Sequence, residues 1–251
     1  GKASVEAGND SWFFITADYA FGHAMEAQLT RVITAAGGKV LGQVRHPVGN
    51  TDYSSFVLQA QASGAKIIAL LNAGGDTTNT IKQAAEFGLV AGGQKLAGTT
   101  FYILNVHALG LEAAQGLQVV TPFYWDRNDA SRDYTRRWRA AMKADKAPTH
   151  NHAGVYSATL SYLKAIQAAG TDEAMAVSKK LKELPVDDFF GEGAHVRADG
   201  RMMKDLFLVQ VKSPAESKAP WDYYTVLNRI PAEQVVRPMS EGGCPLVAGA
   251  S

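Results

Sequence analysis

Hydrophobic positions in the first part of the chain follow two alternating periods. An aromatic and β-branched run at 12–16 precedes apolar residues at three- and four-residue spacing from Phe21 to Ala36. The first pattern predicts a strand and the second an amphipathic helix. The glycine pair at 37–38 ends that helix, and a second strand is predicted over 39–44.

The same alternation continues to about residue 121. The next predicted elements are a helix over 51–63, a strand over 66–71, a helix over 76–87, a strand over 96–100, a helical stretch near 106–114 and a strand over 117–121. Strands that alternate with helices in this way predict an α/β fold with a doubly wound parallel sheet.

After Pro122 the pattern changes, because three helical segments follow with no strand between them. They are predicted over 129–146, 150–169 and 172–184. The second has an apolar face formed by Tyr156, Leu160, Leu163 and Ile166. A β-rich tail then contains a turn at 198–201, a strand at 206–211 and an aromatic run at 221–226. The three helices therefore need a surface to pack on.

Composition and charge exclude several classes of protein. The chain has 251 residues, 46% of them hydrophobic, which is typical of a globular protein with one large domain or two lobes. Its net charge of +1 gives no electrostatic footprint for nucleic acid or an anionic membrane. No apolar run approaches the roughly 20 residues of a membrane-spanning helix. The start has no charged stretch followed by an apolar one, so we expect any secretory signal to lie outside this sequence.

Motifs for catalysis, metals and cofactors are missing from the sequence. It has no GxSxG nucleophile elbow and no GxGxxG dinucleotide loop, so no cofactor is expected. His150 and His152 lie two residues apart near a helix start and do not face one another, so no metal site is expected there. His23 and Glu26 are interpreted as a solvated pair on one helix face.

Two further features are interpreted structurally. Cys244 is the single cysteine, which excludes an internal disulfide and a thiolate zinc site; if it is oxidised, its partner lies on another polypeptide. The basic and aromatic run Arg132–Arg139 is interpreted as the solvated face of an amphipathic helix, with Tyr134 and Trp138 turned inward.

Several short motifs occur in a particular order along the chain. They are Phe14–Gly22, Ala73–Asp76, Val155–Ala158, Ala168–Asp172, Ala198–Arg201 and Glu241–Leu246. In this order they resemble the periplasmic solute-binding proteins of branched-chain-amino-acid-type ABC transporters, the type I periplasmic binding proteins similar to the leucine/isoleucine/valine-binding protein. The resemblance implies two doubly wound α/β lobes joined by three hinge crossings, a ligand in the cleft between them and a periplasmic location.

The resemblance also implies a division of the chain. Residues 1–121 and 206–251 correspond to lobe two, and residues 122–205 to the helical remainder of lobe one. Family members carry a βαβ-rich stretch before the point where this chain begins, and that stretch supplies most of lobe one. We therefore expect the N-terminal segment of the same protein to be a partner of this chain. Alone, the three helices would expose apolar surface.

Ligands of open α/β sheets bind beyond the carboxyl ends of the strands, where helix N-termini present free N–H groups. Three loops are expected there, and their candidate ligand-binding residues are Tyr19, Phe21, Asn72, Ala73, Gly75, Asp76, Phe101 and Tyr102. In similar proteins an aromatic residue just before the Gly packs against the ligand, which favours Phe21 over Tyr19. Two alternatives stay open: Asp18 as an N-cap among core aromatics, and Asp76 as a helix cap rather than an ammonium ligand.

The third loop differs from the pattern of similar proteins. Related binding proteins can place an acidic residue there that holds a ligand amine, whereas this chain has Phe101 and Tyr102. The difference favours a flat, apolar carboxylate such as an aromatic acid, for which ring stacking adds roughly 0.5–1.5 kcal/mol. A branched-chain or hydrophobic amino acid is the other ligand class.

The leading hypothesis is the solute-binding component of an ABC importer. It would capture a small carboxylate by lobe closure and deliver it to an inner-membrane permease, without covalent chemistry. The alternative is a ligand-sensing regulatory protein on the same fold. An enzyme is disfavoured, because no convergent set of nucleophile, base and metal ligands is found. The expected partners are the ligand and the permease, and nucleic acid is not among them.

Overall fold

The computed structural model describes residues 1–247. The chain groups into two compact units, each built from segments that are separated in the sequence. Unit 1 comprises residues 1–120 and 209–226, and unit 2 comprises 121–208 and the described residues from 227 onward. The chain therefore passes between the units after Val120, after Leu208 and after Val226.

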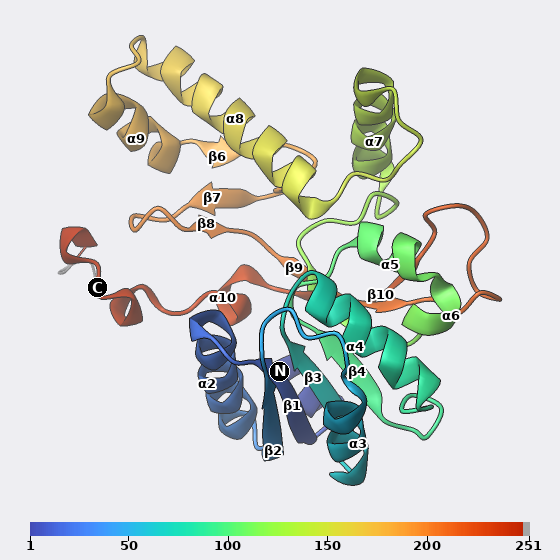
Figure 1. Cartoon of the computed structure of the whole chain (residues 1–251). Coiled ribbons are helices and arrows are strands. Elements are labelled where there is room, and N and C mark those ends of the chain that lie inside the picture. The colour runs from blue at the N-terminus through green and yellow to red at the C-terminus, as the bar shows by residue number, and fades with distance from the viewer. Residues whose placement is uncertain (248–251) are drawn as a thin grey trace. The chain divides into compact units, whose positions relative to one another are not determined.

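Unit 1 is built on a sheet whose strands alternate with helices (Figure 1). Its first strands are β1 (Ser11–Ala17), β2 (Lys39–His46), β3 (Ile67–Leu71), β4 (Lys95–Gly98) and β5 (Gln118–Thr121). Its helices are α1 (Lys2–Glu6), α2 (Ala20–Ala35), α3 (Ser54–Ala62), α4 (Gly75–Glu86), α5 (Ile103–Leu109) and α6 (Leu111–Ala114). Two later strands, β9 (Leu206–Val211) and β10 (Tyr224–Ile230), complete the order β10-β9-β5-β4-β3-β1-β2.

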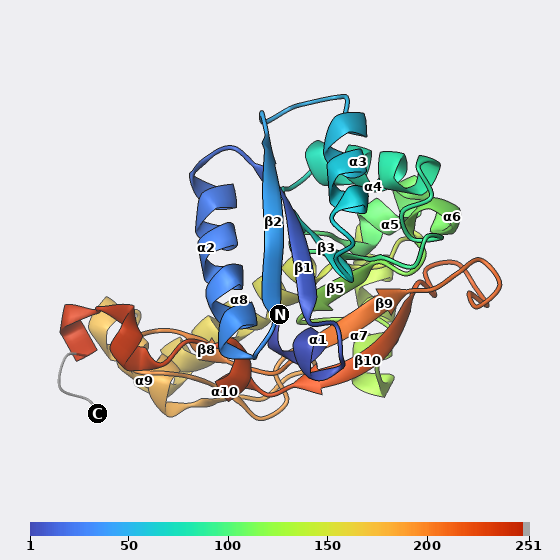
Figure 2. The same ribbon diagram turned by 90° about the horizontal axis from the view of Figure 1, so that it is seen from below.

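Strands β1 to β5 form a parallel ladder, which confirms the predicted fold class. Helix α2 covers one face of this ladder, and α3 and α4 cover the other (Figure 2). Because side chains alternate along a strand, Trp12 and Phe14 of β1 point to the same face, where they pack with Ile33 of α2. All of β3 is buried, as expected for a parallel strand with helices on both faces.

Unit 2 consists mainly of helices. They are α7 (Asp129–Met142), α8 (His150–Ala169), α9 (Ala174–Glu183) and the short α10 (Ala232–Val235), and two 3-10 turns follow at Met239–Gly242 and Pro245–Val247. A small antiparallel sheet joins β6 (Pro185–Val186), β7 (Ala194–Val196) and β8 (Met202–Met203). None of the helices within residues 1–247 has the length and apolarity of a bilayer span.

Aromatic side chains form the core of unit 2. Tyr134 of α7 stacks on Phe189 with ring centroids 3.9 Å apart, and Phe123 meets Tyr134 edge-on. Ala153 of α8 is buried against this cluster, and Trp138 packs at its margin. The inward orientation predicted for Tyr134 and Trp138 therefore agrees with the structure.

Element ends differ from the prediction where single residues interrupt the helix. The stretch near 106–114 is two helices, because Gly110 at φ 82° separates α5 from α6. The helix expected to reach residue 146 ends at Met142, since Lys143 takes the left-handed conformation with φ 49°. The apolar face predicted for α8 is poorly covered, because Tyr156 and Leu163 are exposed.

The compact units also divide the chain slightly differently from the predicted lobes. The prediction placed boundaries after residues 121 and 205 and assigned the whole of 206–251 to one lobe. In the structure the described residues from 227 onward group with the helices of unit 2.

Candidate functional site

The predicted ligand loops follow neighbouring strands at one edge of the unit 1 sheet. Strand β1 pairs with β3 in parallel, so the loops after Ala17 and after Leu71 leave the sheet side by side. Helix α2 begins directly after the first loop and helix α4 after the second. We call this region, formed by residues 18–22 and 72–77, the carboxyl-edge site.

The first loop presents an aromatic pair. The side chains of Tyr19 and Phe21 are 41% and 36% exposed, and their ring centroids lie 5.8 Å apart. Tyr19 is the N-cap residue of α2 in extended conformation. Position 22 requires glycine, because a Cβ there would lie 2.0 Å from the Ala17 carbonyl oxygen. The aromatic–Gly motif thus lets the chain turn tightly while two rings stay at the surface.

Asp18 does not cap α2, contrary to one interpretation of the sequence. Its carboxylate accepts a hydrogen bond from His23 Nε2 at 2.7 Å, and its backbone N–H donates to the His46 carbonyl. The other expected pair, His23 with Glu26, is also replaced: Glu26 binds Arg45 of β2 at 2.7 Å. Burial opposes ionisation of Glu26, but the Arg45 guanidinium holds the pKa of that carboxyl below its usual range.

The second loop exposes backbone at the start of α4. Gly74 has φ 62° and ψ −128°, a conformation that residues with a Cβ rarely adopt. Both Gly74 and Gly75 are exposed, and Ala73 is half-buried. Neither N-cap residue, Tyr19 of α2 nor Gly74 of α4, makes a side-chain cap hydrogen bond. The first N–H groups of a helix without such a cap can bind an anion.

Asn72 is buried at the start of this loop, and both polar groups of its side chain form hydrogen bonds within the protein. Its side-chain amide donates to His46 Nε2 at 3.1 Å and to Thr80 Oγ1 at 3.3 Å, and its Oδ1 accepts from Thr77 Oγ1 at 2.8 Å. His46 in turn donates from Nδ1 to the Pro47 carbonyl. The sequence prediction missed His46, because hydrogen bonding between residues 26 positions apart leaves no local pattern.

Asp76 binds another loop rather than its own helix. Both carboxylate oxygens accept from the Gly49 N–H, at 3.1 and 3.2 Å, which ties the β2–α3 loop to α4. The sequence interpreted Asp76 as a helix cap, whereas in the structure its carboxylate accepts from the Gly49 N–H instead. The neighbouring Tyr53 hydroxyl is buried, and this burial together with the Asp76 carboxylate raises the pKa of Tyr53 well above its ordinary value.

The third loop contributes less surface than expected. Phe101 is only 2% exposed and lies against Gly98 at the end of β4. Tyr102 is half-buried, and its N–H donates to Asn105 Oδ1 at 3.0 Å as α5 begins. Of the eight predicted residues, the exposed and half-buried ones are Tyr19, Phe21, Ala73, Gly75 and Tyr102, and the buried ones are Asn72, Asp76 and Phe101.

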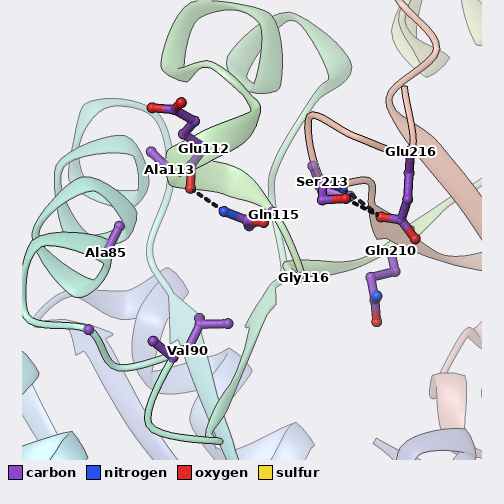
Figure 3. Close-up of a pocket in the computed structure, with 12 residues that line it drawn as sticks. Ala85, Val90, Glu112, Ala113, Gln115, Gly116, Gln210, Ser213 and Glu216 are labelled. Atoms are coloured by element: carbon purple, nitrogen blue, oxygen red, sulfur yellow. Dashed lines mark hydrogen bonds between the residues drawn. The ribbon is translucent and has the colours of Figure 1, made fainter. Parts of the chain in front are cut away.

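A cavity of about 440 Å³ lies elsewhere in unit 1, between the C-terminal end of α4, α6 and the end of β9 (Figure 3). Its polar groups bind one another: Ser213 N–H and Oγ donate to Glu216, and Gln115 donates to the Glu112 carbonyl. A more open hollow of about 640 Å³ lies between α3 and α4. Neither contains a predicted ligand residue.

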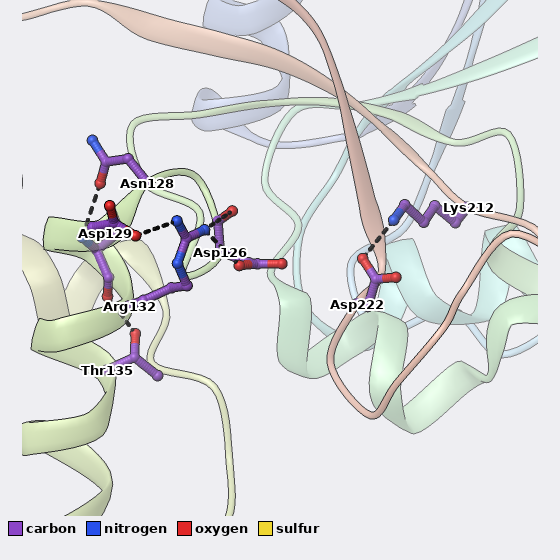
Figure 4. Close-up of polar contacts among 8 residues, drawn as sticks. Asp126, Asn128, Asp129, Arg132, Thr135, Lys212 and Asp222 are labelled. Carbon is purple, nitrogen blue, oxygen red and sulfur yellow. Dashed lines mark hydrogen bonds and ion pairs between the residues drawn. The ribbon is translucent and has the colours of Figure 1, made fainter.

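The remaining candidates from the sequence are structural. His152 Nδ1 accepts from the Thr149 N–H at the start of α8, and no group of three metal-ligand side chains occurs within residues 1–247. On α7, Arg132 binds Asp126 and Asp129, so the basic run is a solvated, ion-paired face (Figure 4). Cys244 is a partly exposed free thiol in the structure.

Comparison with protein families gives one match over most of the chain. The profile of the family described as "Periplasmic binding protein" matches residues 1–218. A curated relative, "Leu/Ile/Val-binding protein homolog 6" of Brucella melitensis, is 27% identical over 184 residues. That alignment covers 70% of this chain and 46% of the relative, so the chain spans about half the length of the curated relatives it matches.

Solved structures show the same fold. A periplasmic binding protein from Burkholderia mallei is 49% identical with a TM-score of 0.87, and the match covers 98% of this chain and 64% of that one. A second similar structure is a branched chain amino acid ABC transporter periplasmic ligand-binding protein from Burkholderia xenovorans. It is 40% identical with a TM-score of 0.89, and the match covers 96% of this chain and 64% of that one. The fold is also shared by a solute binding protein from Rhodopseudomonas palustris in complex with benzoate. It is 18% identical with a TM-score of 0.75, and the match covers 92% of this chain and 61% of that one.

Proposed function

This chain belongs to the periplasmic binding protein family, and we propose that it is the extracytoplasmic solute-binding part of an ABC importer. The family resemblance predicted from the sequence is thereby confirmed, and so is the fold class. The family consists of substrate-binding proteins of transporters rather than enzymes. In this proposal the chain captures a solute, performs no covalent chemistry and delivers the solute to an inner-membrane permease.

The proposed ligand is a small carboxylate, either an aromatic acid or a hydrophobic amino acid. The observation that carries this proposal is the exposed pair Tyr19 and Phe21 beside two uncapped helix N-termini at one sheet edge of the described structure. Helix N-termini favour a carboxylate, and the aromatic rings favour an apolar body. Relatives with this fold include proteins whose names specify branched-chain amino acids or benzoate.

Each predicted site residue receives a role in this proposal. Phe21 and Tyr19 contact the apolar part of the ligand, and the backbone at Ala73 and Gly75 approaches its carboxylate. The buried Asn72, Asp76 and Phe101 hold the loops in position rather than touching the ligand, and Tyr102 borders the site. Unit 1 corresponds to lobe two, unit 2 to the helical remainder of lobe one, and ligand binding favours the closed arrangement of the lobes.

Isothermal titration calorimetry with benzoate and with leucine tests the proposal. Phe21→Ala should weaken binding of the preferred ligand about tenfold, since it removes one aromatic contact. Phe87→Ala is the matched control: Phe87 is 38% exposed but lies at the C-terminal end of α4, away from the carboxyl-edge site. Equal affinities of the two variants would remove Phe21 from the site, and binding of neither ligand class would overturn the proposed ligand.

A further inference from the structure

Two consecutive residues of unit 2, Lys204 and Asp205, lie just before one passage of the chain into unit 1. They precede β9, which leaves unit 2 after Leu208. The other two passages are also close in sequence to groups that these residues bind. Pro122 follows the passage after Val120, and Arg229 follows the passage after Val226.

Lys204 fastens the first passage. Its ammonium donates to the Pro122 carbonyl at 2.8 Å and also to the Phe190 carbonyl. The same nitrogen lies 3.2 Å from the centroid of the Phe190 ring. Two carbonyl acceptors and an aromatic face fix the position of this amine, so the chain at Pro122 is held to the chain at Lys204.

Asp205 fastens the third passage. One carboxylate oxygen accepts from the Arg229 guanidinium, and the other accepts from the Ala232 N–H at 3.0 Å. Arg229 lies on the last part of β10, and Ala232 begins α10. Because Lys204 and Asp205 are adjacent, the three chain segments are joined within unit 2 through a single dipeptide.

We propose that Lys204 and Asp205 form a clamp that makes the three connecting segments move as one body with unit 2. Hinge motions are absorbed by a few loop or element-terminal residues. With the clamp in place, we expect bending in the few residues between the clamped points and unit 1, namely 121 at the end of β5, 206–208 at the start of β9 and 227–228 in the last part of β10. The hinge role rests on the proposed function, whereas the clamp itself is a property of this chain.

Amide hydrogen exchange followed by mass spectrometry tests the clamp without any ligand. Burial and the nearby Arg127 lower the pKa of Lys204 to about 7, while Asp188 and Asp205 act in the opposite direction. The experiment is therefore run at about pH 6, where the amine is charged. Lys204→Met should raise exchange about tenfold in residues 121–125, and Asp205→Ala should do so in residues 229–233.

The ion pair Lys212–Asp222 supplies the matched control. Its side chains are 18% and 14% exposed, and it lies in unit 1 between β9 and β10. Lys212→Met should leave exchange in both connecting segments unchanged. Wild-type exchange in these segments for Lys204→Met and Asp205→Ala would overturn the clamp. So would a uniform rise across unit 2, which would indicate general destabilisation.

A second measurement separates the clamp from the proposed function. Asp205→Asn retains an acceptor for the Ala232 N–H, so exchange at Ala232 should rise much less than in Asp205→Ala. Equal increases at Ala232 in the two variants would contradict the assigned contact. Calorimetry with benzoate and leucine measures ligand binding independently of the clamp. Absence of binding would overturn the proposed function, whereas the exchange result alone decides the clamp.

Discussion

The two units cover their apolar side chains to very different degrees. In unit 1 every residue of β3 is buried, and the side chains of β1 pack beneath α2. In unit 2, α8 leaves Val155 67% and Leu163 55% exposed, and Met175 of α9 is also exposed. The difference follows from the architecture, because a broad parallel sheet with helices on both faces buries its strands, whereas three helices beside a small sheet cannot cover one another completely.

This contrast separates two kinds of apolar residue in one chain. Those of unit 1 are required for its own stability, since they fill a closed core. Val155, Tyr162 and Leu163 of α8 instead leave apolar side chains exposed, so they contribute little to the stability of unit 2. Stability and solubility of the chain should therefore respond to the two sets in different ways.

Matched leucine truncations should show the largest difference. Leu70→Ala removes a fully buried side chain from β3, so it should lower the free energy of unfolding by about 2–5 kcal/mol. Leu163→Ala removes an exposed one from α8 and should change it by less than about 0.5 kcal/mol. Urea unfolding followed by circular dichroism measures both. An equally large loss for Leu163→Ala would mean that the α8 face is covered in solution.

Buried polar side chains should give the next largest contrast. Asn72→Ala leaves His46 and Thr77 without their partner inside unit 1, so it should cost about 1–3 kcal/mol. Ser157 of α8 is equally buried, but its hydroxyl has no hydrogen-bond partner within the described residues. Ser157→Ala should therefore be neutral or slightly stabilising. The same unfolding assay decides, and a loss from Ser157→Ala as large as that from Asn72→Ala would contradict the assigned contacts.

The strands and helices of unit 1 were predicted well, because the sequence patterns that define them are local. The continuous apolar run at Ile67–Leu71 and the three- and four-residue spacing after Phe21 each require only neighbouring positions. Gly22 is explained equally locally, by its approach to the Ala17 carbonyl. The order of the strands up to β5 and of the longer helices between them was therefore predicted correctly, whereas the short helix α1 was not predicted.

The contacts that support the candidate site could not be predicted in full, because several of them are not local. The loop positions follow from the strand order, but the partners of Asp76 and Glu26 lie on other segments of the chain, at Gly49 and Arg45. Burial of Phe101 could not be read from its place in a loop. The three helices were expected to expose apolar surface when alone, and Leu163 of α8 is exposed, since an apolar pattern marks a face without identifying what covers it.

Acid should distinguish a covered ion pair in unit 2 from an open one in unit 1. The Arg197 guanidinium lowers the pKa of Asp199 to about 2, and Lys66 lowers the pKa of the more exposed Asp10. A lowered pKa in the folded state gives stability that is present above about pH 4 and lost as the pH falls towards 2. Urea midpoints between those pH values should fall less steeply for Asp199→Asn than for wild type.

Asp10→Asn is the control for this pH dependence. Its ion pair is more than half exposed, so solvent screening should leave the slope close to that of wild type. A wild-type slope in Asp199→Asn, or a larger change in Asp10→Asn, would show that the covered pair does not contribute to acid stability.

Surface arginines should show the smallest contrast. Arg45 of unit 1 pairs with Glu26, whose side chain is only 12% exposed, so Arg45→Met leaves a covered carboxylate unpaired and should cost about 1 kcal/mol. Arg136 of α7 pairs with Asp133 where both side chains are exposed, and Arg136→Met should cost less than about 0.5 kcal/mol. Urea unfolding at low and at high salt measures both. High salt should reduce the effect of Arg136→Met more than that of Arg45→Met, because screening acts on exposed charges; the reverse order would contradict the burial of Glu26.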